Sequence, residues 1–128
     1  MNEKLLEWLG PAGAYAGFLS DYLDEEIEYD ESVESLEAIQ RHLAGEFNIG
    51  TDIAPLMMDG IASYFGDMLI AVAGGSWDWD DATDRPLVRA DGLEPVDPLR
   101  LINEVIGGAA PDALVETWKL WAEAHNQH

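Results

Sequence analysis

The sequence predicts an α+β fold that is mostly helical, in which a long central helix packs against a small antiparallel hairpin or a three-stranded sheet. Apolar residues recur at steps of three and four between Asp52 and Gly75, which is the period of a helix of about six turns. After Gly75 the period changes to the alternation of a strand, and helical patterns return after residue 96. A chain of 128 residues has the usual length of one domain, so we expect residues 1–128 to form a single domain.

The central helix is expected to be enclosed on most of its circumference, because its apolar arc is wide. One arc differs, since it carries small or acidic residues that let another element approach closely. Thr51 or Asp52 can cap the start of this helix, and Gly74-Gly75 ends it. The apolar positions are Ile53, Leu56, Met57, Ile61, Tyr64, Phe65, Met68, Leu69 and Val72, and the small or acidic arc comprises Asp59, Ala62, Ser63, Gly66 and Asp67.

Helices and one turning segment are predicted before the central helix. A short helix that carries Leu5, Leu6 and Leu9 is expected to break at Gly10-Pro11, and a second helix to run from about Gly13 to Leu23. Eight acidic residues then lie between positions 21 and 34. Ile27 and Tyr29 alternate with these acids, which predicts an extended or turning segment that directs two apolar side chains inward. A third helix is predicted from Glu31 to Ala44.

Strands and two more helices are predicted after the central helix. Trp77 and Trp79 belong to a first strand and share one face, either packed on the central helix or exposed as anchors for a partner. Residues 87–89 form a second strand, and residues 93–96 a third that Pro95 restricts to an edge or an end. Asp97-Pro98 begins a helix that ends at Gly107-Gly108, and a last helix runs from Pro111 to about Ala124.

The charge of the chain is its most unusual property. Twenty-six Asp and Glu residues against six Lys and Arg give a formal net charge of −20. Such a field repels phosphate backbones and anionic headgroups, which argues against direct binding to nucleic acid or to membranes, and it attracts a basic protein partner. A protein that uses its charge only for solubility, or that is adapted to high salt, shows the same composition. The sequence leaves both interpretations open.

No targeting or membrane-spanning signal is visible in the sequence. The amino terminus, Met1 to Lys4, lacks the basic region, apolar run and cleavage site of a secretory signal. No apolar stretch reaches the roughly 18 residues that a spanning helix needs. We therefore expect a soluble, cytoplasmic protein.

Enzymatic chemistry has little support in the sequence. The chain has no cysteine, no GxGxxG and no P-loop, and His42, His125 and His128 lack a neighbouring Ser, Cys or His at a useful spacing. The acids of the predicted hairpin invite a metal site, but a calcium loop counted from Asp78 has Thr83 and Arg89 where glycine and glutamate are required. We predict a non-enzymatic protein without metal or cofactor. The weaker alternative is a metal-assisted hydrolase that uses Asp78, Asp80, Asp81 and Asp84.

One family pattern is visible in the run Tyr64-Phe65-Gly66-Asp67-Met68-Leu69-Ile70, followed by Gly74-Gly75-Ser76-Trp77-Asp78-Trp79, Pro86-Leu87-Val88 and Val96-Asp97-Pro98-Leu99. This pattern resembles a group of small bacterial domains of unknown function, in which a helix leads to Gly-Gly-x-Trp, a short hairpin and a Pro-anchored helix. The stretch from Tyr29 to Leu36 is similar to the segment that precedes them. Asp67 stands where the family has glutamate. The resemblance implies a helix–hairpin–helix scaffold and brings no catalytic residues.

Small acidic domains of this sort can be immunity proteins of bacterial toxin systems, which is an analogy at the level of the fold. We therefore expect an acidic protein-binding module that neutralises a basic toxin. A DNA-mimic inhibitor and a plain soluble domain are the alternatives. The partner-binding surface is placed on the acidic run, with two tyrosines as aromatic anchors: Tyr22, Asp24, Glu25, Glu26, Glu28, Tyr29, Asp30 and Glu31.

Overall fold

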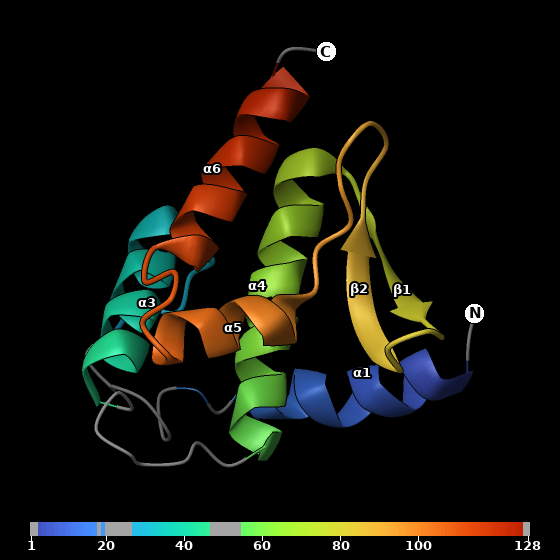
Figure 1. Cartoon of the computed structure of the whole chain (residues 1–128), viewed down its shortest axis with the longest axis horizontal. Helices are drawn as coiled ribbons and strands as arrows, with labels where there is room; N and C mark the ends of the chain where they lie inside the picture. Colours follow the sequence, from blue (N-terminus) through green and yellow to red (C-terminus); the bar gives the residue numbers. More distant parts are fainter. Residues whose placement is uncertain (1–2, 18, 20–26, 47–54, 127–128) are drawn as a thin grey trace.

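The computed structural model of the chain describes residues 3–17, 19, 27–46 and 55–126. Helix α4 lies in the middle, with α1 across one end, α3 and α6 on one side and the hairpin of β1 and β2 on the other (Figure 1). The predicted α+β fold, mostly helical around a central helix, is confirmed. The elements are α1 (Glu3–Ala16), α3 (Val33–Glu46), α4 (Pro55–Ala73), β1 (Ser76–Asp80), β2 (Arg85–Arg89), α5 (Pro98–Ile106) and α6 (Ala113–Asn126).

Helix α4 is enclosed as its wide apolar arc predicts. Between Gly60 and Leu69 every residue except Asp67 is buried. Side chains from α3, α5, α6 and β2 complete the core around it, so this one helix organises the packing of the others. The core residues from these surrounding elements include Leu36, Ile39, Leu43, Val88, Ile102, Val105, Leu114 and Trp121.

Two glycines of α4, Gly60 and Gly66, admit its closest neighbours. A Cβ atom on Gly60 would lie 3.0 Å from the backbone carbonyl carbon of Tyr15, so α1 could not pack at this distance against a larger residue. A Cβ atom on Gly66 would overlap the indole ring of Trp77. Trp77 therefore packs on the central helix, which was one of the two interpretations that the sequence left open.

Helix α1 corrects one prediction. It continues from Glu3 to Ala16 through Gly10 and Pro11, where the sequence predicts a break. Pro11 lies on the exposed side of the helix, and its ring removes one intrahelical hydrogen bond without ending the helix. Leu5 and Ala12, on either side of the proline turn, are both buried. Of the predicted second helix, residues 18 and 20–23 lie outside the described residues.

The hairpin corrects a second prediction. β1 and β2 pair antiparallel, with Ser76 opposite Arg89 and Asp80 opposite Arg85, in a two-stranded sheet. The predicted third strand is a single bridge, in which the backbone N–H and C=O groups of Val96 bond to Val88 at 3.0 and 2.9 Å. Pro95 has no N–H to donate, so the ladder cannot extend through it. The hairpin alternative is correct and the three-stranded alternative is wrong.

The ends of α5 and α6 are capped by side chains. Asp97 caps α5 by accepting from the backbone N–H of Arg100 at 3.1 Å, with Pro98 in the first turn as predicted. The start of α6 is capped from a distant element, since Oε1 of the buried Gln40 on α3 accepts from the N–H groups of Leu114 and Val115 at 3.0 and 3.1 Å. None of the helices in the described part of the chain combines the length and the hydropathy needed to cross a bilayer.

Two tryptophans meet over the small arc of α4. The rings of Trp8 from α1 and Trp77 from β1 have centroids 5.2 Å apart, at an interplanar angle of 54°. Their indole N–H groups donate to Asp59 at 3.0 Å and to Asp67 at 3.1 Å, respectively. The Asp59 carboxyl is half-buried, and this burial raises its pKa above the ordinary value, although the hydrogen bond from Trp8 opposes the shift.

We expect Ile61→Asp to lower the free energy of unfolding by about 3 kcal/mol or more, because Ile61 is 1% exposed and an unpaired carboxylate would be buried. Urea denaturation followed by tryptophan fluorescence measures this loss. Ala71→Asp on the exposed side of the same helix is the control, with an expected cost below about 1 kcal/mol. Equal losses in the two variants would contradict the assigned core face of α4.

We expect Asp59→Asn to stabilise the fold at pH 7 by up to about 1 kcal/mol, because the amide still accepts from Trp8 without a half-buried charge. The folded-state pKa of Asp59 is raised, so its protonated form favours the fold. That contribution is complete below the unfolded pKa and is lost as the pH rises through the folded pKa. The advantage of the variant should therefore vanish near pH 3.

The matched control for this measurement is Asp67→Asn, which removes the same charge beside the other tryptophan of the pair, at an exposed position. Unfolding free energies of both variants and of the wild type are compared at pH 7 and at pH 3. If Asp59→Asn and Asp67→Asn gave equal changes at both pH values, the general negative charge of the chain would explain them, and the effect of burial would be refuted.

Candidate partner-binding site

The predicted partner-binding residues fall into two groups. Tyr22, Asp24, Glu25 and Glu26 lie outside the described residues. The other four residues form a segment that leads into α3, and its side chains take different directions: those of Glu28, Asp30 and Glu31 are exposed, and that of Tyr29 is half-buried.

Ile27 and Tyr29 hold this segment against the core. Both side chains pack on buried residues, which confirms that the apolar residues of the alternating pattern point inward. The Tyr29 ring meets the Tyr64 ring of α4 edge to face, with centroids 6.1 Å apart. Its hydroxyl group donates to the backbone carbonyl of Leu19 at 3.4 Å. Tyr29 thus anchors the segment to the fold, and its role as a contact for a partner stays a prediction.

The hydroxyl group of Tyr64 ties the same segment to the start of α3. It accepts from the backbone N–H of Glu31 at 2.7 Å and lies 2.9 Å from Oγ of Ser35. Because Oγ of Ser35 donates to the carbonyl of Ser32 at 2.6 Å, the proton between Tyr64 and Ser35 comes from Tyr64. Glu31 has a φ of 61°, in the left-handed region that is unfavourable for a side chain, and the hydrogen bond to Tyr64 helps to hold it there.

Asp30 and Ser32 form the cap of α3. Oδ1 of Asp30 accepts from the hydroxyl group and from the N–H group of Ser32, at 2.5 and 3.1 Å. Oγ of Ser32 in turn accepts from the N–H of Ser35 at 3.2 Å, which satisfies a donor of the first helical turn. These two hydrogen bonds from Ser32, first from its side chain and then from its backbone, hold the pKa of Asp30 below its ordinary value. Asp30 therefore remains a carboxylate below its normal titration range.

Three carboxylates surround a hollow of about 450 Å³ beside this cap. Glu28 and Asp30 come from the predicted segment, and Glu34 joins them from the first turn of α3. All three side chains are exposed, whereas Ile27 is half-buried and adds an apolar surface. We call this feature the acidic hollow; its lining residues are Ile27, Glu28, Asp30, Ser32, Glu34, Ser35 and Ala38.

The acidic hollow suits a basic side chain. Ionised carboxylates only accept hydrogen bonds, and a lysine or arginine also has an aliphatic stem that can lie on Ile27 and Ala38. The predicted Glu31 does not line the hollow, whereas Glu34 does; Glu34 ends the acidic run on which the surface is predicted, outside the set of named site residues. The signal that could have found Glu34 is its place in the first turn of a helix, three residues after Glu31.

Three acids of the hairpin, Asp78, Asp80 and Asp84, are engaged in contacts within the fold. Asp78 accepts from the N–H of Trp79 and pairs with Arg89, and these contacts hold its pKa below the ordinary value. Asp80 accepts from Ala82 and Thr83 within the turn, and Asp84 pairs with Lys4 of α1 at 2.8 Å. Among the residues that the structure describes, no group of three or more His, Asp or Glu side chains is placed to hold a metal ion.

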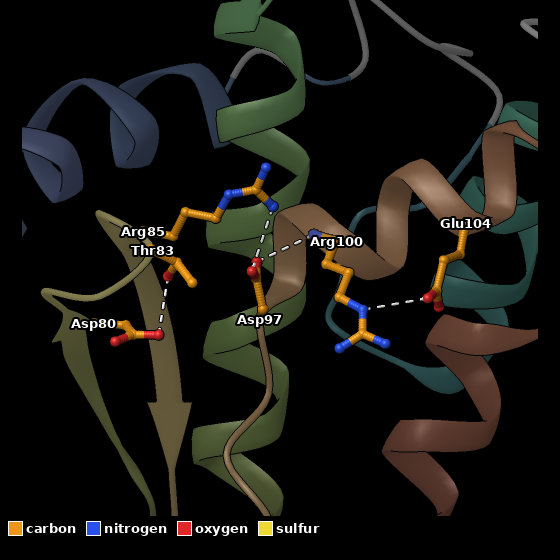
Figure 2. A network of polar contacts seen from close by, with 6 residues as sticks. All are labelled: Asp80, Thr83, Arg85, Asp97, Arg100 and Glu104. Carbon is orange, nitrogen blue, oxygen red and sulfur yellow. Dashed lines mark hydrogen bonds and ion pairs between the residues drawn. The ribbon is translucent and has the colours of Figure 1, made fainter.

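A second groove has a different character, and sequence reasoning did not find it. It lies between the outward face of the hairpin and α5, with a volume of about 890 Å³, and Arg85, Arg89 and Arg100 line it. Figure 2 shows Asp97 between β2 and α5. It accepts from Nη1 of Arg85 at 3.4 Å and from the backbone N–H of Arg100. Nε of Arg100 also donates to Glu104 at 3.3 Å.

We expect Tyr64→Phe to cost about 1–2 kcal/mol of unfolding free energy, because it removes a donor from Ser35 and the acceptor of the Glu31 N–H. It should also raise the rate of amide hydrogen exchange at Glu31 and Ser32, whereas amides in α6 change only as far as global stability does. Tyr29→Phe is the control, since its hydroxyl contact to Leu19 is longer at 3.4 Å. An unchanged exchange rate at Glu31 would contradict the positioning role of Tyr64.

Searches against protein-family models, curated proteins and solved structures found no match to this chain, so its function is inferred from the geometry and charge described above.

Proposed function

We propose that this chain is a non-enzymatic, acidic binding module that docks a basic surface of a partner protein at the acidic hollow. The observation that carries the proposal is the convergence of Glu28, Asp30 and Glu34 around one hollow, within the segment whose sequence predicts the partner-binding surface. The internal hydrogen bonds of Asp30 hold its carboxylate, and the packing of Ile27 holds the segment that carries Glu28, before a partner arrives. Such preorganisation lowers the entropic cost of binding.

The distribution of cations supports a surface that is acidic in general. The chain has six Lys and Arg residues, and four of them pair with its own acids. These pairs are Lys4 with Asp84, Arg85 with Asp97, Arg89 with Asp78, and Arg100 with Glu104. A net charge of −20 then speeds the encounter with a basic partner, and this steering weakens as salt is added.

The most specific form of the proposal is an immunity protein that neutralises a basic bacterial toxin. Toxins that attack nucleic acid need a cationic groove for their substrate, and an acidic domain that occupies this groove blocks it. Lysine or arginine side chains of the groove would enter the acidic hollow. The bacterial setting rests on the resemblance to small bacterial domains.

Two triple variants with the same net charge test the hollow. Glu28→Gln/Asp30→Asn/Glu34→Gln changes the lining, and Glu94→Gln/Glu116→Gln/Glu123→Gln changes three exposed acids elsewhere. Both move the net charge from −20 to −17, because three negative charges are removed from each. Each protein is immobilised to capture partners from its native cell at low salt. The association and dissociation rates of the captured partner are then measured over a series of salt concentrations.

We expect the hollow variant to weaken binding by about tenfold or more, mainly through faster dissociation, and the control to slow association only slightly. Equal changes of the rates in both variants would show that the net charge of the chain, and not the acidic hollow, determines binding. A captured partner that binds DNA without cleaving it, and that loses this DNA binding in the complex, would favour a DNA-mimic inhibitor over an immunity protein. A partner whose rates ignore both salt and the two variants would refute the proposal.

A further inference from the structure

The groove between the hairpin and α5 holds half of the cationic residues of a chain with net charge −20. Three of the six Lys and Arg residues, Arg85, Arg89 and Arg100, line it, and they come from two elements that are apart in sequence. We call it the arginine groove. It shares no lining residue with the acidic hollow; the other lining residues are Asp80, Thr83, Leu87, Pro95, Val96, Asp97, Leu101 and Thr117.

Each guanidinium group has donors beyond those used inside the fold. Arginine presents five N–H donors in a planar fork. Within the described residues, one nitrogen of each side chain is engaged: Nη1 of Arg85 with Asp97, Nε of Arg89 with Asp78 and Nε of Arg100 with Glu104. These contacts orient the three side chains, and they leave N–H groups that can meet a further carboxylate.

The register of the hairpin sets the spacing of this surface. Residues opposite each other in an antiparallel pair share a face, so Arg85, Leu87 and Arg89 lie on the outward face together with Asp78 and Asp80. A strand rises about 3.3 Å per residue, which places the backbones of Arg85 and Arg89 roughly 13 Å apart, with Leu87 between them. Another extended chain has the same repeat. Acidic residues four positions apart in such a chain match the two arginines.

We propose that the arginine groove binds an acidic peptide segment of a partner protein in extended conformation, with the pattern acid-x-apolar-x-acid. The two carboxylates meet Arg85 and Arg89, with Arg100 on the α5 side of the groove, and the apolar side chain lies toward Val96 and Leu101. This site takes a ligand of the opposite charge to that proposed for the acidic hollow, so it does not depend on the proposed function.

The negative charge of the whole chain opposes the binding of an acidic peptide. A net charge of −20 repels an acidic peptide, and Asp80 and Asp97 line the groove beside the arginines. Binding therefore requires that the remaining guanidinium N–H donors outweigh both the field and these two acids. At about 0.15 M salt the field is screened over about 8 Å, whereas contacts inside the groove are screened less. An acidic peptide that binds this protein under such conditions therefore needs a local group of cationic donors, and the positions of the amide shifts tell whether that group is the arginine groove.

The test uses the peptide acetyl-Glu-Ser-Leu-Ser-Glu-amide and its isomer acetyl-Glu-Glu-Leu-Ser-Ser-amide, which has the same composition and charge. Each is titrated into the ¹⁵N-labelled full chain at about 0.15 M salt, where amide shifts report the site and the affinity. The groove variant is Arg89→Gln/Arg100→Gln, whose side chains are 48% and 72% exposed, so its fold should be retained. The control variant, Arg41→Gln/Lys119→Gln, removes two exposed cations elsewhere.

We expect saturable shifts at Arg85 to Arg89 and at Leu101, weakened about tenfold or more in the groove variant and within about twofold of wild type in the control. The isomer should bind more weakly than the matched peptide. The absence of saturable shifts in the wild type, equal losses in both variants, or shifts that map elsewhere would overturn the proposal. Equal binding of free glutamate would assign a small-carboxylate site instead, and would overturn it also.

Discussion

Burial of α4 on nearly all sides is the constraint to which the other elements respond. Between Gly60 and Leu69 only Asp67 is exposed, so a polar group on this helix needs a partner inside the fold. The Tyr64 hydroxyl finds its partners at Glu31 and Ser35, and in doing so it fixes the segment that enters α3. The carboxylates of the acidic hollow stand on that segment and on the first turn of α3. The geometry of the candidate site is therefore a consequence of how the core satisfies one buried hydroxyl group.

The same constraint acts on the small arc of α4. Gly60 and Gly66 let α1 and β1 approach so closely that Trp8 and Trp77 meet above the helix. The indole N–H of Trp8 is partly removed from water and donates to Asp59, whereas that of Trp77 donates to Asp67 at an exposed position. The Asp59 carboxylate is destabilised by this arrangement, because its charge is partly removed from solvent, and its pKa is raised. The acids of this chain thus differ in role: some satisfy buried donors, and others form a charged surface.

The few cations make the charged surface uneven. With six Lys and Arg against 26 acids, each ion pair changes the local field more than it would in a balanced chain. Asp97 shows how one acid can serve two purposes, since it caps α5 and pairs with Arg85 from the neighbouring strand. The result is one face with three carboxylates beside α3, of which Asp30 is held by hydrogen bonds, and another with guanidinium groups beside the hairpin. A protein with two such faces can distinguish partners by the sign and the spacing of their charges.

Local patterns in the sequence determined the elements and the charge, and only the tertiary structure decided which faces meet. The enclosure of α4, the cap at Asp97-Pro98 and the inward Ile27 and Tyr29 follow from periodicity and turn chemistry, which involve neighbours in the chain. The continuity of α1 through Pro11 and the single bridge at Val96 depend on packing and on a missing donor at a sheet edge. Likewise, the partners of Tyr64 are about 30 residues away and those of Gln40 more than 70. Because such contacts depend on close approach between separate elements, the lining of one groove by Arg85, Arg89 and Arg100 had no local signal, whereas the place of Glu34 in a first helical turn did.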